Sequence, residues 1–174
     1  MKIAYTMAPG RGDMDGLLLQ VANTLISRGF HPAGTVQINT ERPGDGPCDM
    51  DVKILPKGPA LRISQHLGTG AKGCRLNPEA LETAVAHVAR DLARPDAPPE
   101  CLIINKFGKH EAEGRGFRDV IAQALIQDIP VLVGVNALNR DAFLEFSDGL
   151  AQEVPATLPD LLAWFERFVC APTA

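Results

Sequence analysis

A group of charged residues follows a short apolar run near the middle of the chain. The run ends at Asn105, and the charged residues after it are Lys106, Lys109, Glu111, Glu113, Arg115 and Arg118. Ligands of open α/β sheets bind beyond the carboxyl ends of the strands, so a site is expected here. The lysines and Arg115 have the charge to bind an anion, and Glu111 or Glu113 could position water or a metal ion. An exposed connection crossed by salt bridges explains the same residues, and the sequence leaves both interpretations open.

A second candidate is the glycine-containing loop Ala8-Pro-Gly-Arg-Gly-Asp-Met-Asp-Gly16, which follows the first expected strand. A phosphate-binding P-loop, GxxxxGK[ST], occupies this place and uses backbone amides, a lysine and a hydroxyl that ligates Mg²⁺. Gly10 and Gly16 stand where the motif glycines are expected, although they are one residue farther apart than in the motif, and Leu17 and Leu18 follow Gly16 where lysine and Ser/Thr are required. The loop is therefore either a tight turn capped by Asp13 or a degenerate anion or nucleotide site.

Some charges of this loop oppose the binding of an anion and one favours it. Asp13 and Asp15 would repel a phosphate, whereas Arg11 could replace the missing lysine as a cation. An arginine cannot replace the hydroxyl that ligates Mg²⁺, so an ordinary P-loop nucleoside-triphosphatase is disfavoured.

A third candidate is the segment from Gln65 to Asn77, in which Gly68, Gly70 and Gly73 accompany Lys72 and Arg75. Glycines let backbone amides converge on an anion, and the two cations would favour its binding. A loop with solvated charges is the alternative.

No metal site is expected from the cysteines. The four cysteines are dispersed without a CxxC pair, and the sequence around Cys48 has no recognisable ligand spacing. Cys101 opens an apolar run and is expected in the core.

Composition limits the class of protein. The chain has 174 residues, 45% of them hydrophobic, which predicts one globular domain over residues 1–174. Its net charge of −4 argues against a broad nucleic-acid surface. No apolar run approaches the roughly 20 residues of a membrane span, so we expect a cytoplasmic protein that binds neither nucleic acid nor membrane.

Strand and helix patterns alternate along the chain. Strands are expected at 2–7, 31–39, 101–105 and 129–135, a hairpin at 49–55 and 60–64, and helices beginning near Leu17, at Pro78, and over 117–127 and 158–169, with Trp164 at the edge of the last. Uninterrupted apolar strands are typical of parallel sheets covered on both faces. The pattern predicts a single three-layer α/β domain with a mostly parallel sheet and a hairpin inserted between layers.

The chain resembles a family of uncharacterised bacterial proteins related to P-loop nucleoside-triphosphatases. The segments that carry the resemblance are Cys48 to Asp51, Ile63 to Gln65, Lys72 to Leu76, Asn105 to Lys109, Glu111 to Arg118 and Val131 to Asn136. The resemblance implies a P-loop-like fold and an association with molybdate-transport genes. Molybdate and phosphate are both tetrahedral oxyanions, and the basic, glycine-containing loops suit either.

The leading hypothesis is an oxyanion-binding or nucleotide-binding protein, with a ligand such as molybdate, phosphate or a nucleotide with Mg²⁺. The expected anion-binding residues are Gly10, Arg11, Gly12, Lys72, Gly73, Arg75, Lys106, Lys109 and Arg115. One alternative is a divergent nucleoside-triphosphatase in which Glu111 or Glu113 supports water or Mg²⁺. The other is a non-catalytic interaction subunit, and a homo-oligomer is compatible with each hypothesis.

Overall fold

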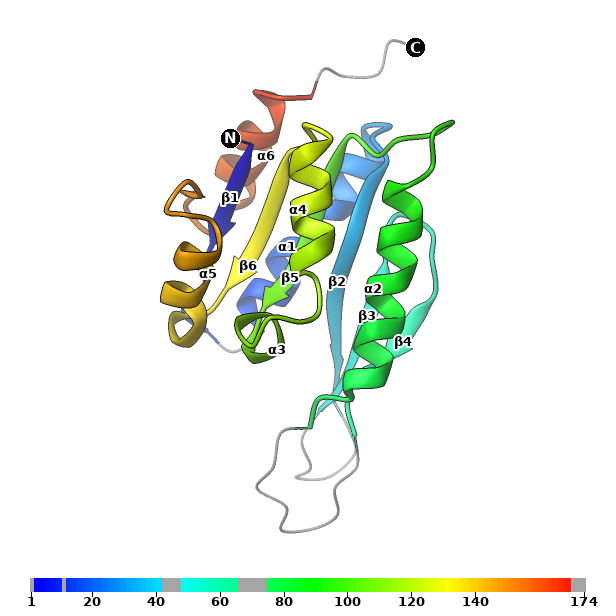
Figure 1. The fold of residues 1–174 in the computed structure, drawn as a ribbon, viewed down its shortest axis with the longest axis vertical. Coiled ribbons are helices and arrows are strands. Elements are labelled where there is room, and N and C mark those ends of the chain that lie inside the picture. The colour runs from blue at the N-terminus through cyan, green and yellow to red at the C-terminus, as the bar shows by residue number, and fades with distance from the viewer. Residues whose placement is uncertain (1, 11, 42–47, 66–74, 170–174) are drawn as a thin grey trace.

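The computed structural model describes residues 2–10, 12–41, 48–65 and 75–169, in which seven strands form one sheet (Figure 1). The strands are β1 (Ile3–Thr6), β2 (Pro32–Thr40), β3 (Asp49–Ile54), β4 (Ala60–Arg62), β5 (Cys101–Phe107), β6 (Val131–Val135) and β7 (Gln152–Glu153). Their order across the sheet is β4-β3-β2-β5-β6-β1-β7. The five strands from β2 to β7 in this order are parallel, and only β3 and β4 pair antiparallel.

Helices cover both faces of the sheet, as Figure 1 shows. On one face α1 (Asp13–Ser27) and α6 (Leu158–Glu166) share a core, and on the other α2 (Pro78–Leu92), α4 (Arg118–Ile126) and α5 (Arg140–Phe146) share a second core. The short helices α3 (Lys109–Ala112) and η1 (Ala137–Asn139) follow β5 and β6. The predicted three-layer α/β arrangement is confirmed. No helix of the described ranges is long and apolar enough to cross a bilayer.

The central strands are apolar throughout because side chains of both faces are buried. In β5, Leu102 and Ile104 belong to the core under α2 and α4, whereas Cys101 and Ile103 belong to the core under α1 and α6. Cys101 is fully buried, as predicted, and burial raises the pKa of its thiol. This alternation sends Asn105, at the end of the strand, to the α1 side.

The hairpin is confirmed, but its expected place between the layers is wrong. β3 pairs with β2 from Thr35 opposite Ile54 to Thr40 opposite Asp49, and β4 pairs with β3. The other edge of β2 is occupied by β5, so the hairpin supplies hydrogen-bond partners for the edge that would otherwise be unpaired. The hairpin therefore widens the sheet.

Trp164 also differs from expectation. It is 2% exposed and packs edge to face against Phe165 and Phe168. The last helix is therefore anchored in the core that it shares with α1, and the sequence pattern missed this because Trp164 lies beside the predicted apolar stripe. The short elements α3, α5 and β7 were not expected either.

β2 and β5 approach each other closely at Gly34, and a substitution there tests this contact. It has a φ of +112° and lies opposite Ile103, and a Cβ added to it would collide with the backbone carbonyl of Ile103. Gly34→Ala is expected to lower the free energy of unfolding by about 3 kcal/mol or more, measured by urea denaturation. Gly149→Ala is the matched control, because Gly149 also has a positive φ, +67°, but no atom lies within 4 Å of its added Cβ. Equal losses in the two variants would contradict the backbone collision.

Candidate functional site at the carboxyl ends of the strands

The loop after β1 leads into the amino end of α1. The helix begins at Asp13, and the residue before it, Gly12, has a left-handed φ of 86° and makes no side-chain cap. The Asp13 side chain lies over Gly10, where an added Cβ would collide with its carboxylate. Asp13 therefore does not cap the helix as expected; it is the first helical residue and is exposed.

The start of α1 also changes how the loop compares with a P-loop. In that motif the lysine and the hydroxyl residue stand where the helix begins. Leu18, which by sequence stands at the hydroxyl position of the motif, is fully buried in the core. The helix begins five residues earlier, with Asp13, Met14 and Asp15. None is a lysine, serine or threonine, and the acidic Asp15 stands in the first turn.

Asp15 is the centre of a buried polar network. Its carboxylate accepts hydrogen bonds from Asn105 Nδ2 at 2.8 Å, from Gln37 Nε2 at 3.2 Å and from Asn39 Nδ2. Lys106 Nζ lies 3.9 Å away, and the Asp15 side chain is only 8% exposed. A buried carboxylate without partners would be strongly unfavourable, so these donors make its position possible. The network ties α1 to the ends of β2 and β5.

Two buried polar atoms of the described residues have no hydrogen-bond partner, Thr6 Oγ1 at the end of β1 and Asn105 Oδ1 in β5. The bond from Asn105 Nδ2 to the carboxylate fixes the orientation of the amide, because the opposite orientation would bring two oxygens together. Asn105 therefore keeps a free acceptor. Unpartnered buried acceptors are uncommon and draw attention to a binding site.

Two adjoining cavities lie beside this network. The smaller, about 170 Å³, is lined by the loop after β1, by Asp15 and by the end of β6, and the larger, about 360 Å³, lies among β2, β3, β5 and α2. Lys106 and Asn136 line both. The smaller cavity lies where the neighbouring strands β1 and β6 end. Their connections leave in opposite directions, because β1 continues through α1 on one face to β2, and β6 continues through α5 on the other face to β7. Ligands of open α/β sheets bind at such points.

The structure brings three of the predicted cations together. Lys106, Lys109 and Arg75 all line the larger cavity, and Lys106 also lines the smaller one. Lys109 is 81% exposed and 3.6 Å from Glu113, and Arg75 donates to the carbonyl oxygen of Cys48 at 2.9 Å.

Arg115 lies apart from these cations. It pairs with Glu113 at 2.8 Å and lines a different cavity, between α2 and α4. Gly10 and Gly12 line the smaller cavity. Arg11, Lys72 and Gly73 fall outside the described residues.

The two glutamates occupy structural positions. Glu111 is 2% exposed, and its carboxylate accepts from the amides of Gly108 at 2.9 Å and Phe117 at 3.4 Å, which joins α3 to the start of α4. Burial raises the pKa of Glu111. Glu113 is bound to Lys109 and Arg115 on the surface. The acidic side chain that lines the smaller cavity is Asp15.

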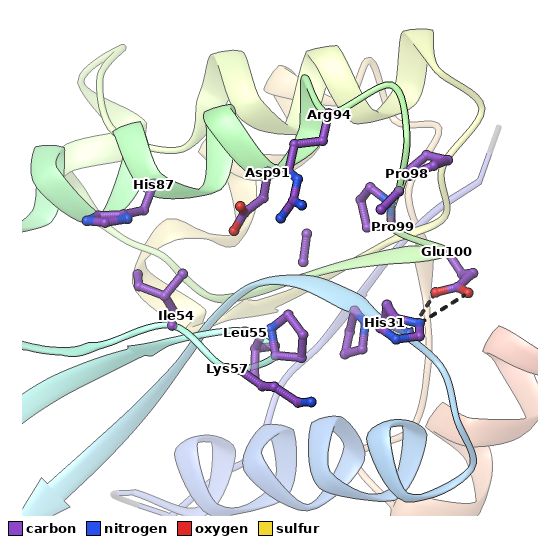
Figure 2. A pocket seen from close by; sticks show the side chains of 15 residues that line it. His31, Ile54, Leu55, Lys57, His87, Asp91, Arg94, Pro98, Pro99 and Glu100 are labelled. Carbon is purple, nitrogen blue, oxygen red and sulfur yellow. Dashed lines mark hydrogen bonds and ion pairs between the residues drawn. The ribbon is translucent and has the colours of Figure 1, made fainter.

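A third cavity, about 550 Å³, lies at the opposite edge of the sheet (Figure 2). His87, Asp91 and Arg94 extend from α2 toward the start of β2 and the turn of the hairpin, and His31 pairs with Glu100 at 3.7 Å. These are the amino ends of the parallel strands, and no residue expected to bind a ligand lies there. The described residues also contain no group of three His, Cys, Asp or Glu side chains that could hold a metal ion.

Comparison with known proteins establishes the family. A model described as "protein of unknown function (DUF2478)" matches residues 3–164. The chain belongs to this family. It is also 32% identical over 164 residues to the molybdenum import ATP-binding protein ModC 2 of Bradyrhizobium diazoefficiens, a match that spans 94% of this chain and 18% of that protein.

The fold resembles that of a solved structure, a human cancer-related nucleoside triphosphatase. The TM-score is 0.66 at 19% identity, with 98% of this chain and all of the other covered. The family and the shared fold confirm the resemblance found in the sequence and the P-loop-NTPase-like α/β domain that it implied.

The partners of Asp15 were not expected from the sequence, which marked Asp15 only as a residue that would repel phosphate. A signal for two of them existed, because Thr35, Gln37 and Asn39 alternate along β2 and place polar groups on one side of a strand that is otherwise apolar. The third, Asn105, stands at the end of an apolar run. Their common partner on a distant helix could be found only from the fold.

The network predicts a cost for changing Asp15. The Asp15 carboxylate accepts three amide hydrogen bonds, whereas the amide of an asparagine has an NH₂ group that would face those donors and cannot accept from them. We therefore expect Asp15→Asn to lower the free energy of unfolding by about 2–4 kcal/mol. Asp13→Asn changes the same charge on an exposed neighbour and should leave stability nearly unchanged. Urea denaturation of both variants measures the difference, and a stable Asp15→Asn would show that the network contributes little.

Proposed function

We propose that the chain binds a phosphate-bearing ligand, with a nucleotide as the leading candidate, in the smaller cavity beside the amino end of α1. The observation that carries the proposal is the position of Lys106. This lysine comes from β5, yet it lines the same cavity as Gly10, Gly12 and the first turn of α1. A cation on β5, two strands away from β1 in the sheet, would therefore take the place of the lysine that is absent from the loop.

The elements around the cavity suit an oxyanion. The amino end of a helix carries unpaired amides and a partial positive charge, which favours an anion there. α1 is 15 residues long, and two glycines precede it. The nucleoside triphosphatase of similar fold and the relative named as an ATP-binding protein support a nucleotide as the ligand.

The residues present do not fit Mg²⁺ as P-loop enzymes bind it. Those enzymes use a hydroxyl at the start of the helix and an aspartate on a neighbouring strand. Here the helix opens without a hydroxyl, β5 carries the amide Asn105 near its carboxyl end, and both oxygens of Asp15 already accept hydrogen bonds. The proposal is therefore binding without hydrolysis, and each oxygen of the buried Glu111 carboxylate already accepts a backbone amide, which gives this residue a structural role.

A bare tetrahedral oxyanion is the second candidate. A cavity of about 170 Å³ has room for an ion of that size, and the name of the molybdenum import relative directs attention to molybdate. Molybdate, phosphate and nucleotides share the negatively charged oxygens that Lys106 would bind, so a titration has to separate them.

Removal of Lys106 tests the proposed site. Isothermal titration of the wild type with ADP, pyrophosphate, phosphate and molybdate is expected to detect binding of at least one, and Lys106→Ala should weaken it about tenfold or more. Lys57→Ala is the control, because Lys57 lies at the opposite edge of the sheet (Figure 2). Unchanged affinity in Lys106→Ala would refute the site. Absence of binding by every anion would refute the function and favour an interaction subunit.

Magnesium provides a separate test. Because the oxygens of Asp15 are engaged, adding Mg²⁺ should change the affinity for ADP by less than about threefold, and ATP should release no phosphate above the rate without protein. Both are measured on the wild type, by titration with and without chelator and by a phosphate-release assay. Magnesium-dependent phosphate release that Asp15→Asn abolishes would instead support the divergent nucleoside-triphosphatase.

A further inference from the structure

The larger cavity has the composition of a small-molecule pocket. Its walls are mostly apolar and come from β3, α2, the start of α4 and the segment that precedes α2, with Met50, Val52, Leu81 and Phe117 among them. Its volume of about 360 Å³ lies in the range of ligand pockets, which are typically apolar with a few polar groups. Its polar groups include the cations Arg75, Lys106 and Lys109 and the buried Asn105, together with one carboxylate, that of Glu111, which accepts hydrogen bonds from the amides of Gly108 and Phe117.

We infer that this cavity binds the apolar ring of the same ligand whose phosphate lies at Lys106, so that the ligand is an organic phosphate and not a bare oxyanion. This inference rests on the proposed function. Lys106 and Asn136 line both cavities, so the two adjoin, and a ligand with its phosphate at Lys106 would place its ring in the larger one. An inorganic anion would occupy the polar cavity alone and leave the apolar walls in contact with water.

The wall of the larger cavity also holds a buried amide, that of Asn105. Asn105 lines the larger cavity, is 2% exposed, and holds an unpartnered Oδ1 whose orientation is fixed by the bond from Nδ2 to Asp15. A ligand amine or hydroxyl that reached this oxygen would satisfy it, and recognition by a buried acceptor discriminates strongly against ligands that lack the donor. A nucleotide has such groups on its base and sugar, and inorganic phosphates carry no apolar ring.

Leu138 stands at the mouth of the same cavity. It is 92% exposed, the most exposed of the large hydrophobic residues of the described part of the chain. The short helix that carries it is fixed by Asn136, whose side chain accepts from the amide of Asn139 at 3.0 Å. A ring that covered this exposed leucine would remove its apolar surface from water, and that burial would contribute to the free energy of binding.

A comparison of ADP with pyrophosphate tests the inference, because the two share the diphosphate and differ in the nucleoside. Isothermal titration of the wild type should give at least tenfold tighter binding of ADP. Leu138→Ser at the mouth and Met50→Gln on the far wall should each weaken ADP about threefold to tenfold and leave pyrophosphate unchanged. Ile126→Ser is the matched control, since Ile126 is 86% exposed at the other end of α4. Thermal denaturation of each variant verifies that it is folded.

The outcomes separate this inference from the function on which it rests. Equal affinity for ADP and pyrophosphate, both lost in Lys106→Ala, would retain the anion site and overturn the ring pocket. Preference for ADP that neither Leu138→Ser nor Met50→Gln reduces would also overturn it, because the nucleoside would then lie elsewhere. Failure of both compounds to bind would overturn the ring pocket, and failure of phosphate and molybdate as well would overturn the proposed function.

Discussion

The burial of one carboxylate, that of Asp15, determines how the carboxyl edge of the sheet is organised. A carboxylate this deeply enclosed is tolerated only where donors surround it, and here three amides and a lysine from two strands do so. The end of β2, the end of β5 and the first turn of α1 are thereby held at fixed distances. The shape of the two cavities and the position of Lys106 between them follow from that arrangement.

The same interaction sets the chemistry that the site can perform. In a P-loop enzyme the first turn of the helix contributes a neutral hydroxyl and the neighbouring strand an acid. Here the acid is on the helix as Asp15, and the strand contributes the amide of Asn105. The negative charge is at the same edge of the sheet, and its oxygens accept hydrogen bonds from amides, so it holds α1, β2 and β5 together. In the proposed site, anion binding would therefore depend on the helix amino end and Lys106.

Much of the fold followed from the sequence because its causes are local. Uninterrupted apolar runs such as Ile129 to Val135 specify buried parallel strands, and Asn77 followed by Pro78 specifies a helix start, which the structure has, with the Asn77 side chain accepting from two backbone amides. The place of the hairpin did not follow, because it depends on which edge of β2 remains unpaired. Short elements such as α5 were missed since seven residues carry little periodicity.

The site was predicted only as a region. Lys106 was recognised because it follows an apolar strand, a rule that needs no knowledge of partners. Arg115 and Glu111 satisfy the same rule, yet Arg115 lies toward another cavity and Glu111 ties a short helix to the next one. What separates them is the element that carries each: Lys106 lies in β5, Glu111 in α3, and Arg115 in the connection between α3 and α4. Charge near the carboxyl end of a strand therefore identifies candidates, and only a shared buried partner, here Asp15, shows that β2, β5 and α1 contribute to one site.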